Sequence, residues 1–156
     1  MIIVAEPISV LICDDVAAMR SLLRIVVELE PRLRVAGEAG TGDDAVLQAQ
    51  TLQPDVILLD LSMPRRTGLD ALPAIRLVAP TSVVIAFSGL DELVVGDAAR
   101  AAGAALFLQK GAKPAAIVAA IVAAHLNGRG NGRVVAENGD SPTGEDAQSA
   151  QPLQSG

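Results

Sequence analysis

The chain has 156 residues, enough for one domain, and 51% of them are apolar although only 1% are aromatic. Its net charge of −6 argues against nucleic-acid binding, because a phosphate-binding surface needs a basic patch. No apolar run approaches the roughly 18 residues of a membrane span, and the single cysteine, Cys13, cannot form an internal disulfide. These features predict a one-domain protein of the reducing cytoplasm.

Short runs of β-forming residues alternate with helical patterns. We expect strands at residues 8–13, 33–37, 55–59, 82–87 and 104–108, and helices at residues 16–30, 43–52, 69–78, 92–102 and 114–126. Most of the strands are apolar throughout, as strands buried on both faces should be. Five β-α repeats with short connections predict an α/β fold, a parallel sheet with helices on both faces.

The last part of the chain differs in composition. Residues 129–156 are rich in Gly, Asn, Ser, Gln and Pro and have almost no apolar content. Such a segment cannot bury enough surface to offset the entropy of ordering it. We therefore expect a folded domain over residues 1–128, followed by a disordered C-terminal tail over residues 129–156.

Polar side chains stand at the ends of four of the expected strands. The first strand leads into Asp14 and Asp15, the third into Asp60, and the fourth and fifth into Ser88 and Lys110. In an open α/β sheet, ligands bind outside the carboxyl ends of the strands. The sequence therefore predicts that three acids, a hydroxyl and an amine meet at one edge of the sheet.

Three carboxylates at this edge would repel one another by roughly 4 kcal/mol per pair at about 4 Å and an effective dielectric constant of about 20. Either one of them retains a proton or a cation lies among them. Hard oxygen ligands that leave positions for water suit Mg²⁺, so we predict a magnesium site at Asp14, Asp15 and Asp60. The alternative is that Asp14 or Asp15 only caps the following helix, and the two roles can coexist.

A carboxylate beside Mg²⁺ can also act as a nucleophile and form an aspartyl phosphate. That chemistry needs a fixed cation and a hydroxyl donor besides the metal, and Lys110 and Ser88 would fill these two roles. Each residue has a simpler explanation. Lys110 could only form a salt bridge with an acid, and Ser88 could be a turn residue ahead of Gly89.

Four segments together resemble the receiver domain of bacterial two-component response regulators: CDDVAAMR, LLDLSMPRRTGLDALPAIR, AFSG and ALFLQKG. The resemblance covers residues 8–126, nearly everything except the tail. It implies a flavodoxin-like, doubly wound (βα)5 fold like that of chemotaxis regulators, with five parallel strands in the order 2-1-3-4-5. It also implies a phosphoryl-accepting signalling protein rather than an enzyme, with at most self-catalysed phosphorylation and dephosphorylation. A sensor histidine kinase or a phosphotransfer protein would donate the phosphoryl group.

The resemblance assigns roles to the residues at the sheet edge. Asp60 would be the phosphoacceptor and Lys110 would pair with the phosphoryl group. Asp15 would bind Mg²⁺ directly, Asp14 would bind it mainly through water, and the backbone carbonyl of Ser62 would complete the metal site.

The resemblance further implies a switch. The hydroxyl of Ser88 would turn to the phosphoryl group and the ring of Phe107 would turn inward behind it. The changed surface would bind a downstream protein or a second copy through the fourth and fifth helices.

The expected last helix has two different sides at 100° per residue. Its bulky side, which should face the sheet, consists of Ile117, Val118, Ile121, Val122 and His125. Its other side consists of Ala115, Ala116, Ala119, Ala120, Ala123 and Ala124. Small side chains would let another backbone approach closely, although Ala is also simply a strong helix former.

Gly111 departs from the family pattern, because many receivers have Pro directly after the Lys. The Lys110-Gly111 pair resembles the subfamily whose receivers precede a helix-turn-helix output domain. Three interpretations follow: a lone receiver, a truncated receiver of a DNA-binding transcriptional regulator, or a receiver-fold interaction module that signals without phosphate. The complete set of acids, Ser and Lys argues against the last.

Overall fold

Five parallel strands form one sheet in the order β2-β1-β3-β4-β5, which confirms the expected fold. This computed structural model describes residues 5–134, with side chains as far as residue 129. The strands are β1 (Ile8–Cys13), β2 (Leu33–Ala39), β3 (Val56–Asp60), β4 (Val83–Ser88) and β5 (Leu106–Gln109). The helices are α1 (Ala17–Glu28), α2 (Gly42–Leu52), α3 (Gly68–Val78), α4 (Glu92–Ala102) and α5 (Pro114–Val134). The first four helices match the predicted ranges to within two residues.

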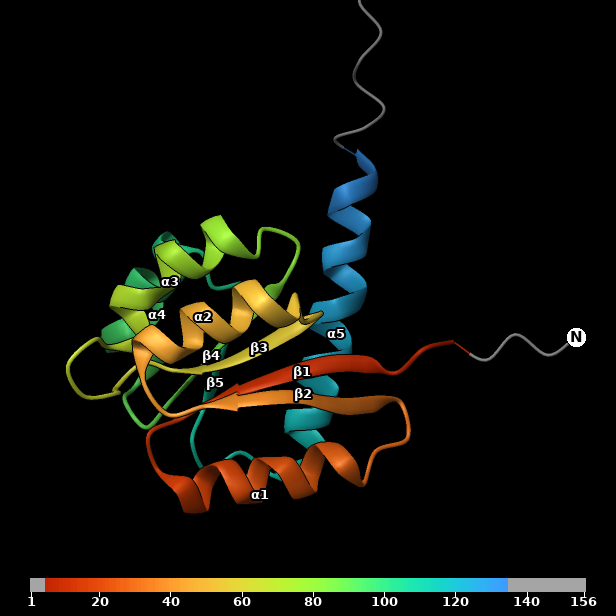
Figure 1. Ribbon diagram of the computed structural model, residues 1–156, viewed down its shortest axis with the longest axis horizontal. Helices are drawn as coiled ribbons and strands as arrows, with labels where there is room; N and C mark the ends of the chain where they lie inside the picture. The colour runs from red at the N-terminus through yellow and green to blue at the C-terminus, as the bar shows by residue number, and fades with distance from the viewer. Residues whose placement is uncertain (1–4, 135–156) are drawn as a thin grey trace, which may run out of the picture.

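Two apolar cores lie on the two faces of the sheet. The helices α2, α3 and α4 cover one face, and α1 and α5 cover the other (Figure 1). Successive side chains of a strand point to opposite faces, so in β1 Val10 and Ile12 pack toward α1 and α5, whereas Leu11 and Cys13 pack toward the other helices. All four are buried, which explains why the strand is apolar throughout.

Four strands run farther than predicted, β2 by two residues and β3, β4 and β5 by one, and both β3 and β4 end on a functional residue. Asp60 pairs with Phe87 at the end of β3, and Ser88 pairs with Gln109 at the end of β4. The predicted ends were placed before the first polar side chain, but ladder hydrogen bonds use only the backbone. The side chains of Asp60 and Ser88 therefore project from ordered strands rather than from loops.

The helix α5 ends at Val134, eight residues beyond the predicted end. The helix therefore continues over residues 129–134 of the expected tail, while residues 135–156 lie outside the described residues, where the disordered tail stays a prediction. Elongating an existing helix avoids the cost of nucleation, and Gly128 has a packing role here. A Cβ at Gly128 would lie 2.5 Å from Val83 Cγ2, so glycine lets the helix pack against the start of β4.

Most of the alanine side of α5 faces outward as predicted, but Ala124 does not. Ile117, Ile121 and Ala124 are buried, whereas Ala119 and Ala123 are exposed. Ala124 lies seven residues after Ile117 and three after Ile121, so helical geometry places it on their side. Although α5 is 21 residues long, no helix within residues 5–134 is long and apolar enough to cross a membrane.

Candidate functional site

The three predicted acids meet at the carboxyl edge of the sheet. Carboxylate oxygens of Asp14, Asp15 and Asp60 all lie within 4.8 Å of one another. Asp14 directly follows β1 and is 0% exposed, Asp60 ends β3 and is 1% exposed, and Asp15 is exposed to solvent. The parallel sheet brings these residues together because β1 and β3 are neighbours and both end at this edge.

The two oxygens of Asp14 have different partners. Oδ1 accepts a hydrogen bond of 2.9 Å from the backbone N–H of Val16, the residue that precedes α1. Oδ2 lies 2.8 Å from Lys110 Nζ, but without the alignment of a hydrogen bond. One oxygen thus holds the loop ahead of α1, and the other remains directed into the site. The N-cap of α1 is Val16, which makes no side-chain cap bond, so the capping alternative for Asp14 and Asp15 is not observed.

Asp60 is held in a similar way. Its Oδ1 accepts a hydrogen bond of 3.0 Å from the backbone N–H of Ser62, and its Oδ2 lies 3.1 Å from Lys110 Nζ. Burial raises the pKa of Asp60, and the neighbouring charge of Asp14 adds to this, while the contacts with Ser62 and Lys110 oppose it. The pKa of Asp60 is raised on balance.

Lys110 is shared by both buried acids, so the salt-bridge alternative for this residue is observed. Burial by itself lowers the pKa of Lys110, but the carboxylates of Asp14 and Asp60 outweigh it, and the pKa is raised. Lys110 is therefore a cation at neutral pH. Three carboxylates and one ammonium together carry an excess of two negative charges, which fits a divalent cation.

Ser88 lies buried at the end of β4 and makes two local contacts. Its Oγ accepts a hydrogen bond of 3.1 Å from the backbone N–H of Leu90, as the turn-residue alternative proposed. Its carbonyl accepts a bond of 2.7 Å from the backbone N–H of Lys110, which ties the lysine to β4. Phe107 is half-buried and packs against the core beneath α2, α3 and α4. The structure therefore does not join the Ser88 hydroxyl to the acids, and its role with Phe107 stays a prediction.

The loop after Asp60 depends on a glycine. A side chain at Gly68 would overlap the backbone carbonyl of Asp60, so only glycine lets the first turn of α3 approach the end of β3 this closely. Gly68 belongs to the segment LLDLSMPRRTGLDALPAIR, and the close approach supplies a physical reason for a glycine at this position.

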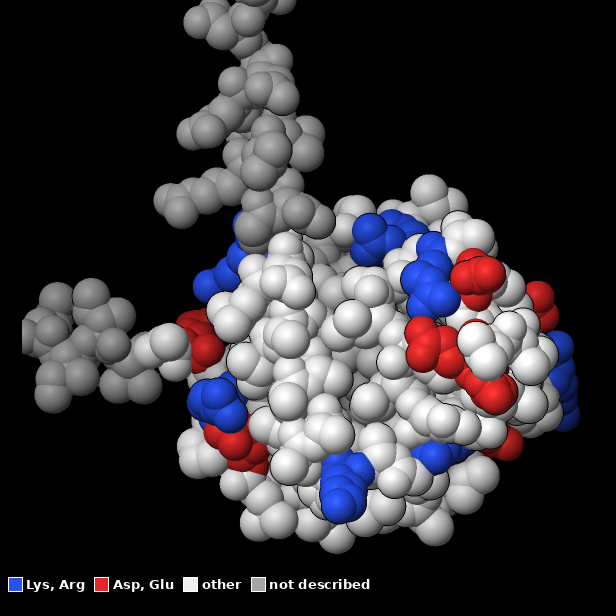
Figure 2. Space-filling view, turned by 180° about the vertical axis from the view of Figure 1, so that it is seen from behind, with Lys and Arg blue, Asp and Glu red and all other residues white. Residues whose placement is uncertain are grey.

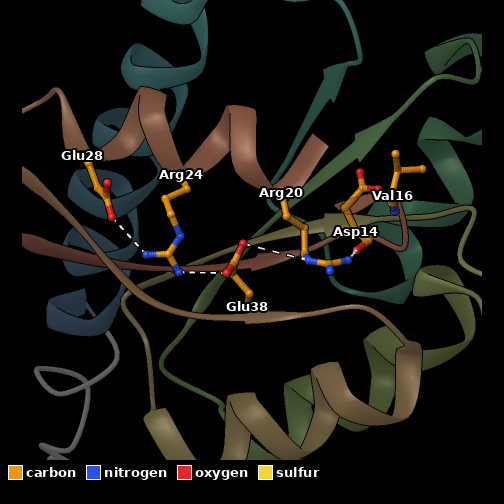
Figure 3. Close-up of polar contacts among 6 residues, drawn as sticks. All are labelled: Asp14, Val16, Arg20, Arg24, Glu28 and Glu38. Atoms are coloured by element: carbon orange, nitrogen blue, oxygen red, sulfur yellow. Dashed lines mark hydrogen bonds and ion pairs between the residues drawn. The ribbon is translucent and has the colours of Figure 1, made fainter. Parts of the chain in front are cut away.

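The sequence reasoning missed one contact of the site. Arg20, on α1, donates from Nη1 to the backbone carbonyl of Asp14 at 2.6 Å (Figure 3). The signal was present, because Arg20 closes the CDDVAAMR segment, but periodicity alone does not predict a bond from a helix side chain to a preceding loop carbonyl.

Comparison with known proteins agrees with this geometry. Residues 10–122 match the family model described as the response regulator receiver domain. The chemotaxis protein CheY of Thermotoga maritima is 35% identical over 112 residues, which cover 72% of this chain and 92% of CheY. The protein-glutamate methylesterase/protein-glutamine glutaminase of Pyrococcus horikoshii is 41% identical over 85 residues, or 54% of this chain. The matched region is only 23% of that relative, so the chain spans about a quarter of its length.

Solved structures resemble the fold closely. The response regulator domain of Thermotoga maritima CheB has a TM-score of 0.72 and 31% identity, covering 77% of this chain and 97% of that domain. A crystal structure of a CheX-CheY-BeF3-Mg²⁺ complex from Borrelia burgdorferi contains a chain with a TM-score of 0.70 and 26% identity. The match covers 76% of this chain and 89% of that one.

Proposed function

Because the chain belongs to the response regulator receiver domain family, we propose that it is a phosphoryl-accepting switch of a cytoplasmic two-component phosphorelay. The observation that carries the proposal is the buried Asp60 carboxylate, which ends β3 with one oxygen 3.1 Å from Lys110 Nζ and an oxygen within 4.8 Å of those of two further acids. A sensor histidine kinase or a phosphotransfer protein is the proposed donor. In this proposal the chain accepts the phosphoryl group and does not act as an enzyme on other molecules.

The transfer step uses one oxygen of Asp60. Oδ1 is held by the Ser62 N–H, so Oδ2, which faces Lys110, is the proposed nucleophile. Oδ2 attacks the phosphorus of a phosphohistidine, an O–P bond forms, and the N–P bond breaks. The imidazole leaves with the electron pair of that bond and takes a proton from solvent. Lys110 stabilises the negative charge of the phosphoryl oxygens through its ammonium group.

Three acids would hold the metal. Asp14 and Asp15 would bind Mg²⁺ together with Asp60, and the Ser62 carbonyl is the proposed backbone ligand. The fit rests on the clustered oxygens, on the excess of negative charge, and on the buried Asp14 Oδ2, which lacks a well-aligned donor among residues 5–134. When bound, Mg²⁺ supplies positive charge to the phosphoryl oxygens.

The signal is proposed to leave through α4 and α5, with Ser88 and Phe107 linking the site to that surface. Large apolar side chains are exposed on α4, where Leu93 is 94% and Val94 75% exposed. Figure 2 shows the molecule from behind, with an area in the middle of this side that has few charged side chains and with acidic and basic side chains gathered toward the edges. Such a face suits a downstream protein or a second copy of the chain.

A labelling experiment tests this function. Acetyl phosphate and Mg²⁺ should add one phosphoryl group to the wild-type protein, detected by intact mass, and fragmentation should place it on the peptide that contains Asp60. Chelation of Mg²⁺ should abolish the label. A label that forms equally well in a chelator, or that lies on another peptide, would overturn the proposal.

A further inference from the structure

A network of ion pairs and hydrogen bonds joins α1 and β2 to the loop that begins at Asp14 (Figure 3). Arg20 Nη1 donates to the backbone carbonyl of Asp14 at 2.6 Å, and Arg20 Nε lies 4.0 Å from Glu38 Oε1 on β2. Glu38 is held more tightly by Arg24, at 2.8 Å, and Arg24 also pairs with Glu28 at 3.0 Å. Arg20 is thus the member of the network that contacts the residues of the site.

The contact lies where the β1–β2 ladder stops. The N–H of Asp14 donates to the carbonyl of Ala39 at 3.0 Å, which is the last backbone bond between these strands. No backbone N–H within residues 5–134 donates to the carbonyl of Asp14, and Arg20 supplies the donor instead. A hydrogen bond from a charged donor is roughly twice as strong as one between neutral groups. The guanidinium therefore fixes the peptide group that joins Asp14 to Asp15.

The surroundings of the guanidinium favour this contact. The Arg20 side chain is only 24% exposed, so the bond to the carbonyl is largely shielded from water. A Cβ at Gly40 would lie 3.3 Å from Arg20 Nη1, so the glycine leaves room for the group. Asp14 is then held at both ends, because its side-chain Oδ1 bonds to Val16 while its carbonyl bonds to Arg20.

We propose that Arg20 is a positioning residue for the metal-binding acids. Through the Asp14 carbonyl it holds Asp14 and Asp15 in the orientation that presents their carboxylates to the cation. The inference rests on the proposed function, because it requires these acids to bind Mg²⁺. It goes beyond that function by assigning part of the metal affinity to a residue that does not touch the metal.

Arg24 offers a matched control. It belongs to the same helix and the same network, but within residues 5–134 its ion pairs are with Glu28 and Glu38 and not with the residues of the site. A purely structural role for the network would make substitutions of Arg20 and Arg24 equivalent. A positioning role makes them differ in Mg²⁺ affinity even where they cost similar stability.

The test measures Mg²⁺ affinity by calorimetry and stability by urea unfolding for wild type, Arg20→Met, Arg20→Lys and Arg24→Met. We expect Arg20→Met to weaken Mg²⁺ binding about tenfold, the scale at which partners of metal ligands act. Arg20→Lys should recover part of the affinity because it retains one donor, and Arg24→Met should leave it within about twofold of wild type. The Val16 amide, which bonds to Asp14, should exchange faster with solvent in Arg20→Met than in Arg24→Met.

Wild-type affinity in Arg20→Met, or equal weakening in Arg24→Met, would overturn the inference and leave the proposed function standing. A wild-type protein that binds no Mg²⁺ would overturn both. If Arg20→Met does not fold, Arg20→Lys compared with Arg24→Lys decides the question in the same way.

Discussion

An aspartate stands at each end of β3, and the two have opposite surroundings. Asp55 precedes the strand, and its Oδ2 accepts hydrogen bonds from both the backbone N–H and the hydroxyl of Ser9, at 2.9 and 3.1 Å. Its own N–H donates back to Ser9 Oγ at 2.9 Å. Asp60 ends the strand and faces two other carboxylates and the shared Lys110. Neutral donors satisfy Asp55, whereas like charges crowd Asp60.

The difference indicates that the Asp55 carboxylate has a structural role, whereas the Asp60 carboxylate belongs to the proposed reactive site. The contacts of Asp55 tie the start of β3 to β1, and its carbonyl also accepts the N–H of Val83 from β4. Asp60 is buried at the sheet edge, and this burial, with a smaller contribution from the neighbouring charge of Asp14, raises its pKa. At one end of β3, Asp55 therefore stabilises the fold, and at the other end Asp60 belongs to the proposed metal site.

The largest expected effect concerns labelling by acetyl phosphate. Asp60→Asn should reduce the label to background, a loss on the order of a thousandfold or more, because an amide is not a nucleophile. Asp55→Asn should be labelled at the wild-type rate under conditions where both proteins are folded. Intact mass over time measures both rates, and an Asp60→Asn protein that still gains the label would contradict the assignment.

The next effect concerns Mg²⁺ affinity. Asp15→Asn should weaken binding by more than about tenfold, because a direct ligand matters at least as much as a partner of a ligand. Asp14→Asn should weaken it less, since one of its oxygens is engaged by Val16. Asp55→Asn is the control and should bind as wild type does. Calorimetry that finds equal binding in wild type and in the Asp14→Asn, Asp15→Asn double variant would show that the metal site is wrong.

A substitution at the start of β3, near Asp55, should change the stability of the protein and not its Mg²⁺ affinity. Ser9→Ala removes the hydroxyl that both donates to and accepts from Asp55, and should lower the free energy of unfolding by about 1–3 kcal/mol. Its Mg²⁺ affinity should stay unchanged. Urea unfolding measures the first quantity and calorimetry the second. A Ser9→Ala protein with wild-type stability and altered metal binding would reverse the roles assigned to the two ends.

The smallest expected effect is on how the free energy of unfolding depends on pH in the absence of Mg²⁺. Because the pKa of Asp60 is raised on folding, the folded state binds more protons than the unfolded state above the usual carboxyl value of about 4. Stability should therefore fall as pH rises from there through the raised pKa, and then level off. The raised pKa of Lys110 contributes stability that is lost only at alkaline pH.

Asp60→Asn should remove the fall in stability that the wild type shows as pH rises through the raised pKa of Asp60. Asp55→Asn should keep this fall. Urea unfolding at a series of pH values in a chelator checks this difference. Identical pH dependence of the free energy of unfolding in wild type and Asp60→Asn would contradict a raised pKa of Asp60 in the folded state.

The sequence predicted the acidic edge well because topology leaves little choice. Once β-α repeats are recognised, a parallel sheet must place the strand-end residues Asp14, Asp60 and Lys110 at the same edge. Contacts that depend on the path of a loop were not predictable in this way. The bond from Arg20 to Asp14 and the pairing of Ser9 with Asp55, 46 residues apart, follow no periodicity.

The length of α5 was the clearest error, and it had a local cause. Glycine is a poor helix former, so the sequence pattern predicts that α5 ends before Gly128. In the fold its missing side chain lets α5 pack against Val83. A sequence pattern does not distinguish a glycine that ends a helix from one that makes room for a strand.

Beryllofluoride binding tests the central claim most directly, because that complex mimics an aspartyl phosphate and needs no kinase. Calorimetric titration with beryllofluoride should give one saturable site in the wild-type protein and in Asp55→Asn. Binding should require Mg²⁺ and should vanish in Asp60→Asn. Absence of binding in the wild type, or equal binding in Asp60→Asn, would contradict the account.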